Sequence, residues 1–199
     1  MPKDTFFNLP EKKRSRIVDS AFLEFSKVHY KQVTIDSIVN GAGIPKGSFY
    51  QYFTNKDDLY KYLFSQIGNE KKHVLEEMKK YKEQLNFREY LIKMLEESKK
   101  FESEDTKLME LKNKFINECP QEVRKDVLKN EIPKSYRLLE EVISGYVKKG
   151  ELRKDLNIKT AAYMITSCVV SLEDYEFDKE ENISEVIIRI IDILINGLK

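Results

Sequence analysis

The chain has few of the residues that build metal sites and disulfide frameworks. It contains two cysteines, Cys119 and Cys168, which stand far apart and outside any CxxC or Cys/His cluster. Its two histidines, His29 and His73, are isolated and show no metal-ligand spacing. We therefore expect no metal and no cofactor, and we expect both cysteines to be buried as small apolar residues.

Glycine is also scarce, with seven in 199 residues. The glycine-dependent motifs GxSxG, the P-loop and the Rossmann fingerprint are missing, and so is HExxH. Paired acids such as Glu76 with Glu77 stand beside lysines and resemble solvated helix faces. We assign no catalytic residues and predict that the protein is not an enzyme, although a small all-helical enzyme stays open as an alternative.

Long apolar runs are missing too. No stretch approaches the roughly 18 uncharged apolar residues that a spanning helix needs, and the N-terminus lacks the apolar core of a signal peptide. Hydrophobic residues make up 41% and charged residues 35% of the chain, a soluble helical profile rather than a disordered one. We expect a cytoplasmic protein without a membrane partner.

What the chain does have is a basic beginning. Residues 1–56 carry nine Lys and Arg against five Asp and Glu, hence +4, so the remainder carries −3 of the net charge of +1. A basic segment on a mildly acidic body is typical of a protein that meets a polyanion. A chance fluctuation on a lysine-rich surface is the alternative explanation.

Apolar residues recur at helical spacing along the whole chain, and no alternating strand pattern appears. The sequence therefore predicts an all-α fold of about nine helices, with a kink or a break at Pro133. The expected helices run from Asn8 to Val28, Ile35 to Ala42, Pro45 to Phe53, Lys56 to Tyr81, Asn86 to Phe101, Leu108 to Ile116, Val123 to Gly150, Ile158 to Leu172 and Ile183 to Leu198.

The stretch TIDSIVNGAGIPKGSFYQYFTNKDDL, residues 34–59, has the pattern of two short helices joined by a glycine turn. Thr34 suits the N-cap of the first helix, and Gly43 suits the tight corner. In the second helix Phe49 and Phe53 can both face inward. This leaves an outward set of groups suited to phosphates and base edges, namely Lys46, Gly47, Ser48, Tyr50, Gln51 and Tyr52. A small helical hairpin whose tyrosines cap a core is the alternative interpretation.

Within this stretch, AGIPKGSFYQYFTNKDDLY resembles the DNA-binding signature of the TetR family of transcriptional repressors. The match is carried by Gly43, Lys46, Gly47, Ser48, Tyr50, Tyr52, Phe53 and Lys56. Beyond the N-terminal part, only the helical layout and the segment GELRKDLNIKTAA at residues 150–162 are similar. The resemblance implies a three-helix helix-turn-helix DNA-binding domain in residues 1–55, followed by a helical effector-binding and dimerisation domain in residues 56–199.

Family roles carried onto matching positions give each side chain an expected task. Gly47 permits close approach to DNA. Members of the family often carry histidine at the position of Gln51, so a base preference is not carried over; we choose Gln51 for base readout because a glutamine amide can bond bidentately to adenine. The expected phosphate contacts are Thr34, Lys46, Ser48, Tyr50, Tyr52 and Lys56. The resemblance further implies a homodimeric repressor that binds a palindromic operator in double-stranded DNA and is released by a small-molecule effector.

The effector is expected among bulky side chains of the middle helices, for each of which plain core packing is the alternative role. The candidates are Phe64, Met78, Tyr81, Tyr90, Met94, Phe101, Phe115, Tyr136 and Tyr146. The abundance of Tyr, Phe and Met, together with the lack of tryptophan, favours an apolar or aromatic ligand.

The last two expected helices suit a subunit interface. The helix from Ile183 to Leu198 is apolar over more than one face. So wide a stripe is either buried inside a large domain or shared with a partner, and we favour a second copy that covers part of it. The predicted dimer interface comprises Ala162, Ile165, Val169, Val170, Ile187, Ile191 and Ile195.

A helical sensor that acts through a protein partner is the second alternative to a DNA-binding regulator. The intact polar run from Lys46 to Lys56 argues against it. Salt dependence separates the two, because phosphate contacts make log K for duplex DNA fall linearly with log salt, whereas a protein-binding module shows no such slope.

Overall fold

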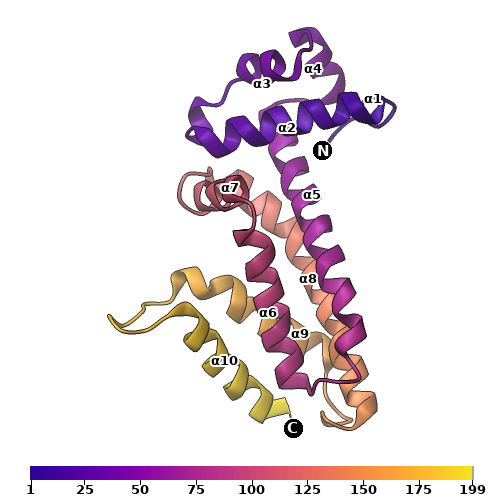
Figure 1. The fold of residues 1–199 in the computed structure, drawn as a ribbon, viewed down its shortest axis with the longest axis vertical. Helices are drawn as coiled ribbons and strands as arrows, with labels where there is room; N and C mark the ends of the chain where they lie inside the picture. The colour runs from indigo at the N-terminus through magenta and orange to yellow at the C-terminus, as the bar shows by residue number, and fades with distance from the viewer. Residues whose placement is uncertain (199) are drawn as a thin grey trace. The chain divides into compact units, whose positions relative to one another are not determined.

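The computed structural model describes residues 1–198, apart from the side chains at 173, 174 and 198, and this range is helical without strands, as predicted (Figure 1). The elements are α1 (Asp4–Phe7), α2 (Glu11–Lys27), η1 (Tyr30–Gln32), α3 (Ile35–Ala42), α4 (Lys46–Tyr52), α5 (Lys56–Glu77), η2 (Met78–Tyr81), α6 (Phe87–Ser103), α7 (Thr106–Asn117), α8 (Gln121–Lys149), α9 (Ile158–Val170), η3 (Ser171–Asp174) and α10 (Ile183–Leu198).

The chain packs as two compact units. The first comprises residues 1–71 and 100–131, and the second comprises residues 72–99 together with the chain from residue 132 onward. Helices α5, α6 and α8 therefore each contribute residues to both units. The expected division of function between residues 1–55 and 56–199 stays a prediction, because the first packing unit extends well beyond residue 55.

The core of the first unit is built on α2. Ile17 and Ala21 of this helix have no exposed surface, and they share a cluster with Ile38 of α3 and Phe49 of α4. Helix α2 also packs against α7, whose Leu111 belongs to the same cluster. The short helices α3 and α4 thus rest on a core larger than three helices alone could supply.

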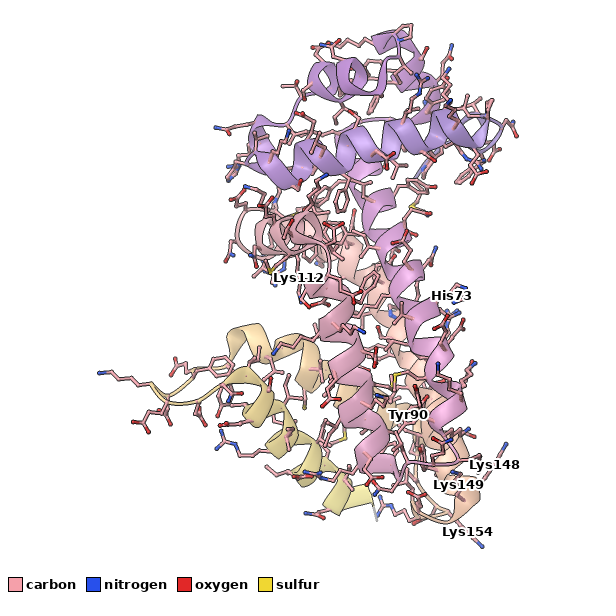
Figure 2. All side chains as sticks on the ribbon, in the orientation of Figure 1. His73, Tyr90, Lys112, Lys148, Lys149 and Lys154 are labelled. Carbon is pink, nitrogen blue, oxygen red and sulfur yellow. The ribbon has the colours of Figure 1, made fainter. Side chains whose placement is uncertain are left out.

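The second unit has its own apolar cluster. Ile143 and Tyr146 of α8 have no exposed surface, and they pack with Tyr90 of α6, which is labelled in Figure 2, and with Ala162 of α9. The Tyr146 hydroxyl donates a hydrogen bond to the carbonyl oxygen of Leu85 at 2.9 Å, so the buried polar group is satisfied.

Several expected helix ends are confirmed by their caps. The Thr34 hydroxyl accepts a bond from the Ser37 N–H at 3.0 Å at the start of α3. Asn86 and Glu89 form a reciprocal capping box at the start of α6, with bonds of 2.9 and 3.0 Å. Gly150 follows the end of α8 with φ 80°, a conformation that favours glycine.

Three expectations about the fold were wrong in detail. Helix α1 was not anticipated, because four residues are too few to show a helical period. Of the expected kink or break at Pro133, a break does not occur, because Pro133 lies inside the continuous helix α8, both halves of which are held in apolar clusters; the kink stays a prediction. Cys119 and Cys168 are half-buried rather than buried. Within residues 1–198, no helix is both long and apolar enough to cross a bilayer.

Candidate nucleic-acid interface

Helix α4 is held in place by its two phenylalanines. Phe49 and Phe53 have no exposed surface, and their ring centroids lie 5.5 Å apart, as the spacing of four residues predicts. The corner before α4 depends on Gly43, which adopts φ 62° after α3 while the Ile44 N–H donates to the Val39 carbonyl at 3.0 Å. A tight turn and a buried aromatic pair therefore fix one face of α4 and leave the other free.

The free face of α4 carries polar side chains. Lys46, Gly47, Tyr50 and Gln51 are exposed, and Ser48 is half-buried. Tyr50 keeps 46% of its surface exposed, so its hydroxyl is open to a partner outside the protein. Helix α4 thus carries six of the eight residues expected to meet DNA, and five of them lie on its free face.

Neither the packing around Gly47 nor its backbone conformation requires a glycine at this position. A Cβ added at this position would meet nothing within 4 Å among the described residues, and the backbone there lacks the positive φ that favours glycine. Glycine inside a helix costs about 1 kcal/mol relative to alanine. The open space above Gly47 is therefore consistent with the close approach of an external molecule.

Lys46 forms an ion pair on the same surface. Its Nζ lies 2.8 Å from Asp36 Oδ2 of α3, and both side chains are more than half exposed. The hydrogen bond to Asp36 raises the pKa of Lys46, so the ammonium form is secure. An exposed pair of this kind is weak, and a phosphate can replace the carboxylate.

Thr34 lies at the exposed start of α3, and its hydroxyl oxygen is engaged as the cap acceptor described above. The Ser37 hydroxyl donates to the Thr34 carbonyl at 2.8 Å in the same turn. The Thr34 hydroxyl proton can still be donated to a phosphate oxygen while the oxygen caps the helix.

Tyr52 does not face outward as expected. It is 5% exposed, its ring centroid lies 6.2 Å from that of Phe6, and Lys13 Nζ lies 5.7 Å from its centroid. The reason is α1, which covers this part of α4. The ring of Tyr52 therefore belongs to the core, and its expected phosphate contact stays a prediction that the burial does not favour.

Lys56 is also turned inward. Its Nζ donates to the carbonyl oxygens of Tyr30 and Val33, each at 2.9 Å, and lies 4.9 Å from the centroid of the Tyr30 ring. Burial lowers the pKa of Lys56. The geometry gives this lysine an internal task, namely to hold η1 and the following loop at the start of α5, rather than the phosphate contact that the sequence led us to expect.

Several cations stand at the start of α2, where they oppose the helix dipole. Two of them nevertheless have local structural roles. Arg14 donates a bond of 2.7 Å to the carbonyl oxygen of Phe7, and Lys13 stacks on Tyr52. Both therefore stabilise the contact between α2 and the N-terminal segment. Lys12 and Arg16 remain exposed on α2.

Sequence reasoning missed the segment that precedes α2. Lys3 and Thr5 hydrogen-bond to backbone carbonyls of α4, and Phe6 is buried against Phe53. The only signal that could have pointed to it is a pair of adjacent phenylalanines in a polar stretch, which is too short for a periodicity argument.

The nine effector candidates fall into both units. Phe64, Phe101 and Phe115 belong to the first unit, where the Phe64 and Phe115 rings lie 4.4 Å apart. In the second unit the candidates are Met78, Tyr81, Tyr90, Met94, Tyr136 and Tyr146. Met78, Tyr90 and Tyr146 are buried in the apolar cluster, whereas Tyr81, Met94 and Tyr136 are only half-buried.

The expected interface residues point largely into their own subunit. Ala162, Ile165, Ile191 and Ile195 are at most 5% exposed and belong to the apolar cluster of the second unit. Val169 and Ile187 are half-buried, and Val170 is 37% exposed. The burial of these four side chains within one chain does not favour an interface role, and the predicted dimer interface stays a prediction.

The opposite faces of the same helices carry the exposed apolar residues. Tyr163 and Met164 of α9 are 55% and 44% exposed, and Ile193 of α10 is 72% exposed. Ala162 with Ile165, and Ile191 with Ile195, stand three or four positions apart and enter the cluster. The residues between them, such as Tyr163 and Ile193, therefore face away from the cluster. We call this set, Tyr163, Met164, Val170 and Ile193, the exposed apolar face.

Comparisons with known proteins agree with this geometry. Residues 17–63 match the family model described as bacterial regulatory proteins, tetR family. The fatty acid metabolism regulator protein of Bacillus subtilis (strain 168) is 24% identical over 195 residues, covering 94% of this chain and 95% of that protein.

Two solved structures extend the likeness to the whole chain. A TetR family transcriptional regulator from Chloroflexus aurantiacus J-10-FL is 28% identical, with a TM-score of 0.50, and covers 100% of this chain and 98% of its own. The regulator FadR from Bacillus subtilis in complex with stearoyl-CoA is 18% identical, with a TM-score of 0.61, and covers 93% and 99%. The matched segment contains α3, α4 and the start of α5, which are the elements of the candidate interface.

Proposed function

Since this chain is a regulator of the TetR family, we propose that it is a repressor that binds a palindromic DNA operator as a homodimer and releases it when a small molecule with an apolar chain binds in its second unit. The observation that carries the DNA-binding part is the exposed polar face of α4. It presents a cation, a phenol and an amide, at Lys46, Tyr50 and Gln51, above two buried phenylalanines.

Each group on this face has a distinct task. Lys46 and Tyr50 can bond phosphate oxygens, which positions the protein on DNA, and Gln51 can bond a base edge, which carries sequence information. Gly47 leaves room for the sugar-phosphate backbone to approach. A helix of seven residues lies within the length that a major groove admits.

The homodimer rests on the exposed apolar face of α9 and α10. Scattered single apolar residues on a surface need no explanation, but Tyr163 and Met164 are adjacent and both are more than 40% exposed. A two-fold symmetric dimer carries two copies of α4, and helix-turn-helix dimers engage successive major grooves roughly 34 to 36 Å apart. The operator is therefore palindromic.

For the effector we propose a long-chain fatty acyl-CoA. The Bacillus subtilis relative that aligns over 94% of this chain is named a fatty acid metabolism regulator, and a protein of the same fold was solved with stearoyl-CoA. In this chain, Tyr81 and Met94 lie half-buried against the apolar cluster of the second unit. A flexible methionine at the edge of an apolar cluster can adapt to an acyl chain.

The DNA-binding part is tested by selection from a pool of random duplexes at moderate salt. Recovery of one palindrome is the expected result, with half-sites one helical turn apart. Recovery of no sequence by folded protein would overturn the proposal and would favour a sensor that acts through a protein partner.

The effector part is tested by titrating stearoyl-CoA into the complex of protein and selected operator, with coenzyme A and stearate as matched controls. Stearoyl-CoA is expected to release the DNA, and the operator is expected to weaken stearoyl-CoA binding by the same factor, because coupling between two sites is reciprocal. Release by none of the three would exclude this effector class while leaving operator binding intact.

A further inference from the structure

The C-terminal end of α4 is capped by a segment that comes from the beginning of the chain. The last carbonyl groups of any helix have no partner within that helix. In α4 the backbone N–H of Lys3 donates to the Tyr52 carbonyl at 2.8 Å, and Lys3 Nζ donates to the Tyr50 carbonyl at 2.7 Å. The hydroxyl of Thr5 donates to the carbonyl of Gln51. Three successive carbonyls of α4 are therefore satisfied from one short segment.

This segment is anchored independently of those bonds. Phe6 has no exposed surface, and its ring centroid lies 4.9 Å from that of Phe53 and 5.3 Å from that of Tyr62. Arg14 of α2 holds the carbonyl of Phe7 at 2.7 Å. Helix α1 consequently lies against α4 as part of the first unit (Figure 1).

We propose that Lys3 and Thr5 are positioning residues for DNA reading, which cap the end of α4 and so fix the direction in which Tyr50 and Gln51 leave the protein. This inference rests on the proposed DNA-binding function. Two of the three capped carbonyls belong to Tyr50 and Gln51 themselves, so fraying of the last turn would move both side chains.

Helix α4 needs such a cap more than a longer helix would. It has seven residues, which make about two helical turns. Isolated helices of this length are not stable in water. Phe49 anchors the middle of α4 and Phe53 its end, where the Phe53 N–H donates to the Phe49 carbonyl, but neither residue donates to the carbonyls of Tyr50, Gln51 and Tyr52. The N-terminal segment supplies them.

Lys3 could alternatively serve as one more cation for phosphate, and the two roles differ in salt dependence. A lysine that contacts phosphate adds about 0.9 to the slope of log K against log salt, whereas a positioning residue leaves the slope unchanged. The Lys3→Met variant removes the ammonium group and keeps an unbranched side chain. The Thr5→Val variant removes the hydroxyl and keeps the shape.

The first measurement needs no DNA. Amide hydrogen exchange of Phe53, whose N–H donates to the Phe49 carbonyl at 2.9 Å, is expected to become about tenfold faster in the Lys3→Met/Thr5→Val double variant, since one or two hydrogen bonds are lost. The Ile44 amide at the end of α3 serves as the internal control and is expected to keep its rate. An unchanged Phe53 rate would overturn the cap.

The second measurement uses the operator selected from random duplexes. The double variant is expected to bind it about tenfold more weakly, with an unchanged salt slope and a relaxed base preference at the position read by Gln51. Thr5→Ser, which restores the hydroxyl, is expected to bind like the wild type, and Lys12→Met serves as the control for loss of an exposed cation. A slope reduced by about 0.9 in Lys3→Met would overturn positioning in favour of a phosphate contact.

Failure of the inference is distinguishable from failure of the proposed function. If the wild-type protein recovers no operator while the Phe53 amide still exchanges faster in the double variant, the cap exists but α4 does not read DNA. If the wild type recovers an operator and the double variant binds it equally well, DNA reading stands and the positioning role is overturned.

Discussion

The ammonium group of Lys56 lies 2.9 Å from the carbonyl oxygen of Val33, so the first residue of α5 holds the loop that leads into α3. The same Nζ also reaches the Tyr30 carbonyl at 2.9 Å. Tyr30 in turn donates from its hydroxyl to Asp57 Oδ1 at 2.5 Å. The start of α5 thus donates hydrogen bonds to the segment before α3, and it also accepts one from that segment.

Replacing Lys56 with methionine is expected to lower the free energy of unfolding by about 1 to 3 kcal/mol, because two partly buried carbonyls lose a charged donor. Urea denaturation of the purified variant measures this change. Lys46→Met is the matched control, since Lys46 is exposed, and this variant is expected to unfold at the same urea concentration as the wild type. Equal stability with a reduced salt slope for DNA would instead make Lys56 a phosphate contact.

Gln51→Ala is expected to relax base preference at one position of each half-site, at a discrimination cost of about 1 to 3 kcal/mol, because a base-edge contact is lost. Selection from a randomised operator measures the preference. Retention of the wild-type preference would show that another residue reads that base.

Lys46→Ala is expected to weaken binding to all duplexes nearly alike and to reduce the slope of log K against log salt by about 0.9, because a phosphate contact is lost. Fluorescence anisotropy at several salt concentrations measures both quantities. Asp36→Asn is the complementary variant: it removes the competing carboxylate 2.8 Å from Lys46 Nζ and is expected to strengthen binding to every duplex. A base-selective effect in either variant would contradict the phosphate role.

Ile193→Asp is expected to convert the proposed homodimer to a folded monomer, since the side chain is 72% exposed in one chain and would carry an unpaired charge into the interface. Sedimentation velocity measures the association state, and circular dichroism verifies that the helices persist. Asn196→Asp adds the same charge at an exposed position of α10 and is expected to remain dimeric. A dimeric Ile193→Asp protein would place the interface elsewhere.

The stability of the first unit is expected to fall as the pH rises from about 9 towards 11. Burial raises the pKa of the Cys119 thiol from 9.0 to about 11, so in this window the unfolded chain loses its proton first and unfolding is favoured. This contribution is complete below pH 9 and is lost as the pH passes 11. Burial also raises the pKa of the neighbouring Tyr60, which acts in the same direction.

Urea denaturation at pH 8 and at about pH 10.5 measures this effect. The Cys119→Ala variant is expected to show a smaller loss of stability between the two pH values, whereas Cys168→Ala is expected to behave like the wild type. An equal loss in all three proteins would assign the alkaline sensitivity to the tyrosines alone.

Local rules accounted for much of the fold before any packing was known. The cap at Thr34, the box of Asn86 with Glu89 and the turn at Gly43 follow from interactions within a few residues of the chain, so the sequence predicts them directly. The pair Phe49 and Phe53 follows equally from helical spacing.

Where a side chain could pack in more than one direction, local rules were insufficient. Tyr52 and Gln51 are adjacent on α4 and both look suited to DNA, yet Phe6, 46 positions earlier than Tyr52, covers only the former. The outward or inward direction of Ile191 and Ile193 on α10 was equally open, because that helix is apolar over more than one face.

The sequence by itself determined that this protein is helical, that residues 34–59 form a helix-turn-helix and that its outward groups suit DNA, because these features depend on periodicity, caps and turn residues close together in the chain. Only the tertiary structure decided that Lys56 holds a loop, that Lys3 and Thr5 cap α4 and which face of α10 stays open. Each of these depends on groups brought together from distant parts of the chain, whose approach no local pattern encodes.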